Sequence, residues 1–252
     1  MPAAPAIVWF RDDLRVADNP ALTAPSRTGQ PVIAAFVLDE ETSGIRRLGG
    51  ASRWWLAGAL RALDQSLQER GIALTLRRGP AERAIAELAR ESSATAIFWN
   101  RRYEPAAARV DQAVASDLTA RGMDVQTFQA SLLFEPSGIR TRSGSPFTVF
   151  TPFLRHVLAR DEPRRPLPPP ERITGASGVA SERLEGWGLE PRTPDWAAKL
   201  AEHWTRGEAG ARERLADFAD GALADYADRR DRPDLLGTSR LSPHVRFGGV
   251  SP

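Results

Sequence analysis

The chain has 252 residues, of which 42% are hydrophobic and 26% charged, and it contains no cysteine. Disulfides, thiolate-held zinc and cysteine nucleophiles are therefore excluded. Its 34 basic and 32 acidic residues leave a net charge of +2, which alone is weak support for a nucleic-acid partner.

The amino-terminal stretch MPAAPAIVWFRDD bears on where the protein acts. It has no basic segment before its apolar run and reaches a charge at Arg11, so it does not resemble a signal peptide. No apolar run approaches the roughly 18 residues of a membrane span. We therefore expect a soluble, cytoplasmic monomer without a membrane partner.

Five short apolar runs predict buried strands. They lie at Ala6–Phe10, Pro31–Asp39, Ile72–Arg78, Thr95–Asn100 and Met123–Phe128. Helical patterns separate several of them, at residues 51–71, 80–92 and 104–122. The first has leucines at helical spacing, at Leu56, Leu60, Leu63 and Leu67.

This alternation is typical of a parallel sheet with helices on both faces. We therefore predict an α/β fold, a doubly wound five-stranded parallel sheet, for residues 1–134. Ligands of such sheets bind beyond the carboxyl ends of the strands. We expect Trp9, Trp54, Trp55 and Trp99 to lie in the core, and the doublets Arg46–Arg47 and Arg77–Arg78 to be solvated surface.

The pattern changes after Phe134. Residues 144–162 hold a phenylalanine cluster and one short helix, and residues 161–196 are rich in proline. We predict a connector over residues 135–196, either draped over a surface or linking two domains. Helical patterning resumes at residues 208–233, so we predict that an all-α domain begins within residues 197–252. One stripe of that helix is formed by Leu215, Phe218, Ala222 and Tyr226.

The closing segment GTSRLSPHVRFGGVSP contains most of the chemistry. Thr238, Ser239 and Ser242 offer hydroxyls beside the Arg240 guanidinium, and Ser242-Pro243 predicts a helix start with Ser242 as its N-cap. Such a corner would suit a phosphate, although a capped helix beside a solvated loop has the same pattern. With three histidines and no H-E-x-x-H motif, we expect no metal site, and each histidine to be exposed or packed.

Four segments resemble the photolyase/cryptochrome family, in the family's order. They are VWFRDDLRVADNPAL, SRWWLAGALRALDQSL, FTVFTPFLR and YADRRDRPDLLGTSRLSPHVRFGGVSP. The likeness spans essentially the whole chain. Within the family, the chain most resembles bacterial class I cyclobutane pyrimidine dimer photolyases. It implies an α/β domain, a connector and a helical domain that holds FAD. It also implies light-driven repair, in which excited reduced FAD passes an electron to a pyrimidine dimer flipped out of UV-damaged DNA.

The resemblance also implies roles for individual residues. Arg230 would contact DNA, although an ion pair with Asp231 or Asp234 is an equal alternative. FAD would be held by Tyr226 and by the phosphate-binding loop Thr238, Ser239, Arg240, Leu241 and Ser242.

The sequence departs from the family where some members hold a folate antenna with an Asn-Glu pair. Ala106 and Ala107 stand there, so a folate held in that way is doubtful. A deazaflavin, another flavin or no antenna remains open.

We expect the chain to be the amino-terminal part of a longer protein, inactive in repair alone and without catalytic residues of its own. Ser251-Pro252 has the pattern of an N-cap followed by the first residue of a helix, and the given sequence contains no residue after it. The alternatives are a cryptochrome-type photoreceptor, whose deciding residues would lie beyond Pro252, and a free-standing α/β module that binds a chromophore.

Overall fold

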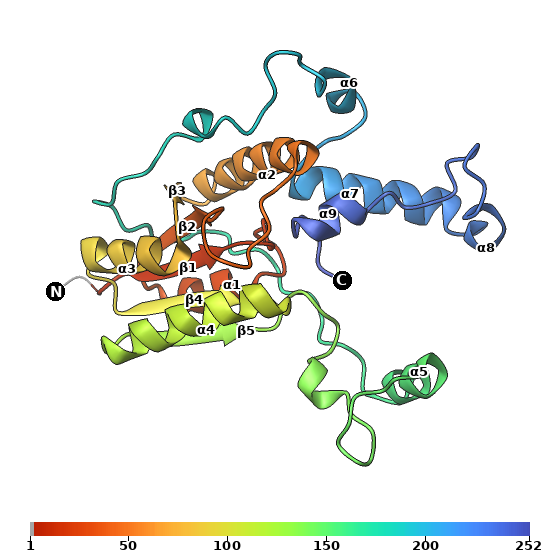
Figure 1. Cartoon of the computed structure of the whole chain (residues 1–252), viewed down its shortest axis with the longest axis horizontal. Coiled ribbons are helices and arrows are strands. Elements are labelled where there is room, and N and C mark those ends of the chain that lie inside the picture. Colours follow the sequence, from red (N-terminus) through yellow and green to blue (C-terminus); the bar gives the residue numbers. More distant parts are fainter. Residues whose placement is uncertain (1–2) are drawn as a thin grey trace.

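A five-stranded parallel sheet forms the centre of the molecule in the computed structural model, which describes residues 3–252 (Figure 1). Met1 and Pro2, with which the predicted first domain begins, lie outside the described residues. The strands are β1 (Ala6–Phe10), β2 (Val32–Leu38), β3 (Leu74–Arg78), β4 (Ala96–Asn100) and β5 (Asp124–Phe128). Each of the five predicted runs therefore contains a strand.

The strand order is β3-β2-β1-β4-β5, and every neighbouring pair is parallel. The chain moves outward from β1 to β3 and then crosses to β4 on the other side of β1. The direction of progression thus reverses between β1 and β4, where open α/β sheets bind their ligands.

Helices cover both faces of this sheet. Ala6, Val8 and Phe10 of β1 pack on one face, with α1 (Pro20–Thr28) and α2 (Gly50–Gln68). Ile7 and Trp9 pack on the other, with α3 (Ala81–Ser92) and α4 (Pro105–Ala120). The predicted doubly wound α/β fold is confirmed, and so are the core positions of the leucine stripe and of the four tryptophans.

The connector is held to the surface of the α/β body by backbone hydrogen bonds. Val32 N donates to Thr174 O at 2.8 Å, Ala176 N donates to Val32 O at 3.0 Å, and Glu182 N donates to Leu76 O at 2.9 Å. These bonds hold residues 174–182 against the body, whereas α5 projects away from the sheet (Figure 1), so the connector over residues 135–196 stays a prediction. Its helical turns are η1 (Pro136–Gly138), α5 (Phe150–Leu158) and η2 (Leu184–Trp187).

Residues 197–252 contain helices and no strand, all of them within the described part of the chain. The helices are α6 (Ala198–Ala201), α7 (Glu208–Asp217), the π-helical turn η3 (Phe218–Ala222), α8 (Tyr226–Arg229) and α9 (Ser242–Arg246). The helix that we predicted over residues 208–233 is therefore interrupted. Its stripe is not buried, since Leu215 and Tyr226 are exposed.

The loop after β1 fastens this helical segment to the sheet. Leu14 N donates to Phe247 O at 3.1 Å, and Val16 N donates to the Glu208 carboxylate at 2.7 Å. The buried Arg15 guanidinium donates to three carbonyl oxygens, those of Gly248, Asp18 and Ala130. Among residues 3–252, no helix has the length and apolarity needed to cross a bilayer.

Candidate functional site

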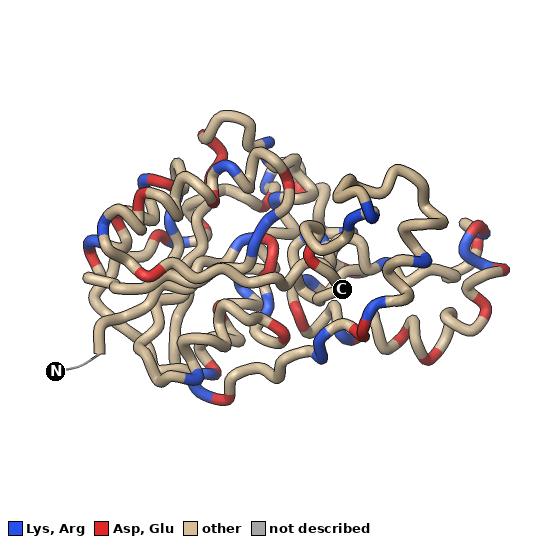
Figure 2. The backbone as a smooth tube through the Cα atoms, turned by 90° about the horizontal axis from the view of Figure 1, so that it is seen from below, with Lys and Arg blue, Asp and Glu red and all other residues tan. Residues whose placement is uncertain are grey.

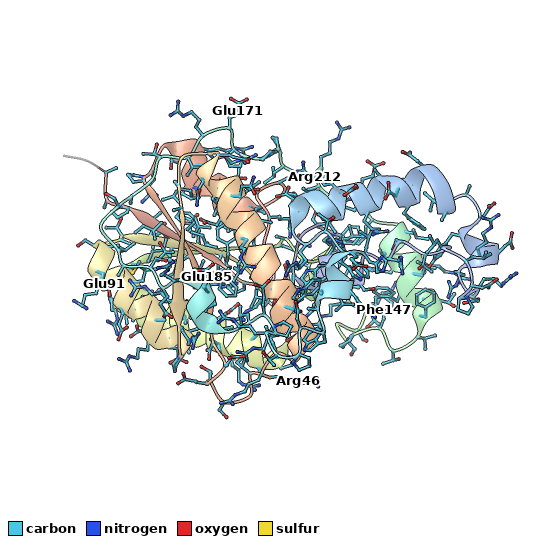
Figure 3. All side chains as sticks on the ribbon, turned by 90° about the horizontal axis from the view of Figure 1, so that it is seen from above. Arg46, Glu91, Phe147, Glu171, Glu185 and Arg212 are labelled. Carbon is cyan, nitrogen blue, oxygen red and sulfur yellow. The ribbon has the colours of Figure 1, made fainter. Side chains whose placement is uncertain are left out.

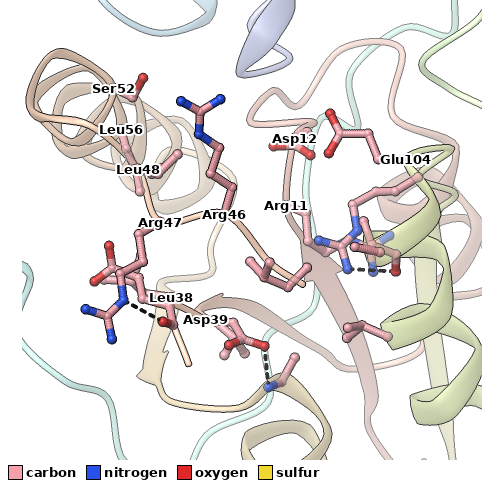
Figure 4. Close-up of a pocket in the computed structure, with 18 of the residues that line it drawn as sticks. Arg11, Asp12, Leu38, Asp39, Arg46, Arg47, Leu48, Ser52, Leu56 and Glu104 are labelled. Atoms are coloured by element: carbon pink, nitrogen blue, oxygen red, sulfur yellow. Dashed lines mark hydrogen bonds between the residues drawn. The ribbon is translucent and has the colours of Figure 1, made fainter. Parts of the chain in front are cut away.

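A pocket of about 680 Å³ opens at the carboxyl ends of β1 and β2 (Figure 4). Trp9, Arg11 and Asp12 line it from β1 and the residues after it, and Phe36–Gly49 contributes much of another wall. The start of α4 adds Ala106 and Ala107, and the helical segment adds Arg246 and Phe247. The pocket is thus lined by residues that follow β1, β2 and β4, so it lies beside the point where the strand order reverses. Its walls come from both the α/β body and the helical segment.

Five arginines line the pocket, accompanied by four carboxylates. The arginines are Arg11, Arg46, Arg47, Arg102 and Arg246, and the carboxylates are Asp12, Asp39, Glu40 and Glu104. Positive and negative residues are also interspersed over the rest of the chain (Figure 2).

Not all of these arginines are neutralised by the protein. Arg246 pairs with Asp12 at 2.6 Å, and Arg102 pairs with Asp111 at 2.5 Å. Arg46 forms no ion pair within residues 3–252, and Figure 4 places it across the pocket from Glu104. Its guanidinium is thus available to an anionic ligand.

Arg11 is the most deeply buried charge of the pocket, at 6% exposure. Burial lowers the pKa of Arg11 to about 10, although the neighbouring Asp111, 3.4 Å away, opposes the shift. The Nε and Nη1 atoms of Arg11 and the Nε1 atom of Trp9 are buried without a partner in the described structure. Buried donors are nearly always paired, so these atoms indicate an acceptor supplied by a ligand or by water.

Asp39 holds the loop that carries Arg46 and Arg47. Its carboxylate accepts hydrogen bonds from the Thr42 hydroxyl at 2.6 Å and from Ala81 N at the start of α3 at 3.0 Å. Burial alone would raise the pKa of Asp39, but these hydrogen bonds outweigh it and lower the pKa. Asp39 thus anchors the pocket wall as a carboxylate.

Sequence reasoning predicted this edge of the sheet and singled out Ala106 and Ala107, but it missed the arginines that line the pocket. The expectation that Arg46–Arg47 is solvated surface is confirmed, since both residues are exposed, but it did not foresee that both also line a pocket. The signal that could have found them is their position in the loop directly after β2.

The residues that the resemblance assigns to FAD lie outside this pocket, in the helical segment. Tyr226 begins α8, 37% exposed, with its ring 5.7 Å from the ring of Phe218. Thr238, Ser239, Arg240 and Leu241 form the loop between α8 and α9. The loop approaches α8 closely at Gly237. A Cβ at this position would lie 2.6 Å from Arg229 O, so only glycine allows this approach. The loop is thereby held close to the helix that begins at Tyr226.

Arg240 has a left-handed backbone, with φ of +55°. Its guanidinium lies 5.7 Å from the ring centre of Trp204. A strained, non-glycine conformation of this kind is often found at functional sites. Within the described residues, no hydrogen bond occupies the hydroxyls of Thr238 and Ser239, so the loop keeps free donors for an anion.

The predicted N-cap role of Ser242 was wrong. Helix α9 begins at Ser242 itself, with Leu241 in the cap position and no side-chain cap hydrogen bond. The helix has only five residues, so its amino terminus by itself adds little to anion binding. The Ser242 hydroxyl remains exposed beside the loop.

Arg230 is exposed and forms one of the two ion pairs that the sequence left open as an alternative to DNA contact. Its Nε lies 3.5 Å from the Asp231 carboxylate, whereas Asp234 pairs with Arg232. The Asp231 side chain is 88% exposed. An ion pair this exposed contributes little stability, so it leaves Arg230 able to exchange its partner for a phosphate.

His244 is packed between two tryptophans at the base of the loop. It is 2% exposed, and its ring centre lies 4.9 Å from Trp55 and 6.3 Å from Trp204. Burial lowers the pKa of His244, and the positive charge of Arg214 adds to this, while a backbone hydrogen bond at Gly207 opposes it. The imidazole is therefore neutral at pH 7.

We expect His244 to make stability fall in mild acid. As the pH drops below about 6.5, the unfolded chain protonates His244 while the folded chain does not, so the free energy of unfolding decreases. Urea titrations at pH 5 to 8 measure this slope. His244→Phe should flatten it, and His203→Gln, at an exposed position, should not. An unchanged slope in His244→Phe would contradict the assignment.

Comparisons with known proteins match this chain to one family. A family model described as DNA photolyase matches residues 6–171. The chain is 44% identical to the deoxyribodipyrimidine photo-lyase of Agrobacterium fabrum, over 99% of this chain and 52% of that protein. It is 38% identical to cryptochrome-1 of Arabidopsis thaliana, over 98% of this chain and 36% of that protein.

A solved structure matches the whole fold. It is the crystal structure of a bacterial class III photolyase from Agrobacterium tumefaciens, with a TM-score of 0.95 and 43% identity over 100% of this chain and 52% of that one. This relative is described as class III, so it does not support the class I likeness that we expected. The chain spans about half the length of the photo-lyases it matches, and it belongs to the photolyase/cryptochrome family.

Proposed function

We propose that this chain forms part of a deoxyribodipyrimidine photo-lyase, which repairs cyclobutane pyrimidine dimers in UV-damaged DNA with light. The observation that carries the proposal is the likeness to the Agrobacterium fabrum photo-lyase over nearly every residue of this chain. The protein would act in the cytoplasm, and it would be a monomer.

The proposed division follows the change of architecture along the chain. Residues 1–134 would form the α/β antenna domain, residues 135–196 the connector, and residues 197–252 the first helices of the FAD-binding domain. The absence of strands from residues 129–252, all described, supports this division.

The chain's own contribution to FAD binding would be positional. Bound reduced FAD would supply the photoexcited electron that splits the dimer. Tyr226 would pack against the cofactor. The phosphates of FAD would accept hydrogen bonds from the loop residues Thr238, Ser239, Arg240, Leu241 and Ser242. Arg230, on the same exposed end, would contact the DNA backbone.

The pocket beside β1 and β2 would hold a second, antenna chromophore. Its volume suits a flavin-sized ligand. Ala106 and Ala107 line it, and neither side chain can hydrogen-bond a folate. The unpartnered donors of Arg11 and Trp9 and the free guanidinium of Arg46 favour an anionic flavin or deazaflavin.

Reversing the charge of Arg46 is expected to weaken binding of an anionic flavin about tenfold, since a charge-assisted hydrogen bond contributes about 1.5 kcal/mol. Fluorescence titration of the chain with FMN measures the affinity of Arg46→Glu. Arg83→Glu, on the outer surface of α3, is the matched control and should bind like the unaltered chain. Equal affinities for all three proteins, or tight binding of a folate alone, would contradict the flavin assignment.

The repair activity is tested with a protein that joins this chain to the half of the Agrobacterium fabrum photo-lyase that it does not match. We expect near-UV or blue light to remove thymine dimers from a damaged oligonucleotide, with none removed in the dark. Flavin photoreduction without any loss of dimers would refute the repair proposal.

That refuting result would favour the second candidate, a cryptochrome-type photoreceptor. The similarity to Arabidopsis cryptochrome-1 over 98% of this chain is the observation behind it. A third candidate, a free-standing chromophore-binding α/β module, predicts that this chain alone is monodisperse and retains a pigment.

A further inference from the structure

Positive and negative residues are interspersed over most of this chain, but residues 136–165 are an exception. They contain six arginines and two acidic residues, Asp161 and Glu162, so they carry a net charge of +4. The whole chain carries only +2, so all its other residues together carry −2. We call residues 136–165 the basic segment. Its arginines are Arg140, Arg142, Arg155, Arg160, Arg164 and Arg165.

The protein neutralises only one of these six arginines. Within residues 3–252, Arg164 pairs with Asp18, and the other five form no ion pair. All six are exposed. Elsewhere an exposed arginine often has a carboxylate partner, as Arg61 has in Glu190 at 2.8 Å. Exposed guanidiniums that are close in sequence and unpaired repel one another, so a polyanion lying across them is favoured.

A tight turn holds two of the arginines. Thr141 N donates to Ser145 O at 2.8 Å, and Gly144 N donates to Thr141 O at 2.9 Å. The hydroxyl oxygen of Thr141 also accepts a hydrogen bond from Ser145 N at 3.2 Å. Arg140 and Arg142 flank Thr141, so this turn fixes the backbone of both.

The end of α5 is tied to the same turn. Arg160 donates from Nη1 to Gly138 O at 2.9 Å, which brings its guanidinium beside the residues that lead to Arg140. Figure 1 shows α5 and this loop projecting from the α/β body, at the end of the molecule opposite α3. In Figure 3 the labelled Phe147 lies toward that end, and Glu91 of α3 lies at the other.

We propose that the basic segment binds the phosphate backbone of duplex DNA, in addition to the contact proposed for Arg230. A guanidinium matches a phosphate with two parallel hydrogen bonds. Phosphate contacts also come from serine and threonine hydroxyls. Six such residues are interleaved with the arginines: Ser137, Thr141, Ser143, Ser145, Thr148 and Thr151. Backbone contacts of this kind carry no sequence information, so they would position the duplex rather than select a lesion.

The placement of the basic segment fits this role. Helix α8, which ends directly before Arg230, lies at the same end of the molecule as α5 (Figure 1). A lipid surface is the other extended polyanion, but helices that lie in a membrane interface have several cations on their polar face. α5 has nine residues and only one arginine, Arg155. The other arginines lie outside the helix, so we take DNA as the partner.

This choice of partner rests on the proposed function. Binding is measured in the dark, without FAD and with an undamaged duplex. A failure of this proposal is therefore distinguishable from a failure of repair.

The test is titration of a short fluorescein-labelled duplex with this chain, read by fluorescence anisotropy over a range of NaCl concentrations. Each phosphate contact adds about 0.9 to the slope of log affinity against log salt. Arg140→Gln/Arg142→Gln should therefore reduce this slope by about 1.8 and weaken binding at least tenfold at low salt. Arg140→Lys/Arg142→Lys should keep the slope, because it keeps both charges.

The matched control is Arg90→Gln/Arg183→Gln. It removes the same charge from two exposed arginines that lie outside the basic segment and form no ion pair within residues 3–252. This control should keep the slope of the unaltered chain. All the altered side chains are exposed, so each variant should fold normally, which thermal unfolding checks.

The absence of cysteine from this chain allows a second measurement. In Ser143→Cys, which places a thiol in the turn, the duplex should slow maleimide labelling at least tenfold. Ser116→Cys, at an exposed position of α4, should label at the same rate with and without duplex. An unchanged slope in Arg140→Gln/Arg142→Gln or equal labelling of Ser143→Cys would overturn the proposal. Binding to polyglutamate or to phosphatidylserine vesicles as tight as binding to the duplex would overturn it as well.

Discussion

Replacing Gly248 with alanine is expected to lower the free energy of unfolding by about 3 kcal/mol. Gly248 has a φ of +67°, where a Cβ costs about 1 kcal/mol. A Cβ there would lie 2.2 Å from Asp12 O and 2.4 Å from Asp13 Cα, and backbone atoms cannot rotate away as a side chain would. The overlap therefore adds about 2 kcal/mol.

The matched control for this variant is Gly144→Ala. Gly144 also has a positive φ, of +81°, but nothing lies within 4 Å of its added Cβ. It should lose only the backbone cost of about 1 kcal/mol. Urea unfolding followed by tryptophan fluorescence measures both variants, and equal losses would show that the close approach to Asp12 and Asp13 is not tight.

The same variant should also disturb the pocket. Asp12, which a Cβ on Gly248 would displace, lines the pocket and pairs with Arg246, another lining residue. FMN affinity should therefore fall in Gly248→Ala and remain unchanged in Gly144→Ala. That result would show that one wall of the pocket depends on the contact between Gly248 and the backbone of Asp12 and Asp13.

The sheet could be predicted from sequence because buried parallel strands are short, nearly continuous apolar runs. AIVWF of β1 is such a run, with all five residues buried. Helix α1 was missed because Pro25 lies inside it, although Pro20 at its first position is compatible with a helix start. Asn19 forms that helix locally by accepting a hydrogen bond from Leu22 N, a contact that no hydrophobic period contains.

The pocket could be predicted only in part. Arg11 follows β1 directly, and the loop with Arg46 follows β2, so the rule for parallel sheets indicates that edge. Arg246 could not be found in this way, because tertiary contacts bring α9 to the pocket from the far end of the chain. Likewise, the sequence pattern of Ser242-Pro243 was that of a cap, but Leu241 takes the cap position in the folded protein.

Replacing Arg15 with methionine is expected to lower the free energy of unfolding by about 3 kcal/mol. Its guanidinium, 3% exposed, donates to Gly248 O at 3.1 Å, Asp18 O at 3.0 Å and Ala130 O at 2.9 Å. Methionine fills similar space without donors, so buried carbonyl oxygens lose their partner. Arg15→Lys should lose less, since an ammonium can still reach some of these oxygens.

The control is Arg83→Met. Arg83 forms an exposed ion pair with Glu87 on the outer face of α3, so losing this pair should not change the free energy of unfolding measurably. Because Arg15 and Gly248 belong to one junction, their effects should not add. The double variant Arg15→Met/Gly248→Ala should lose less than the sum of the single losses, as residues that share a partner do. Full additivity in urea unfolding would mean that Arg15 does not depend on the position of Gly248. The helical segment would then be held to the sheet by independent contacts rather than by one junction.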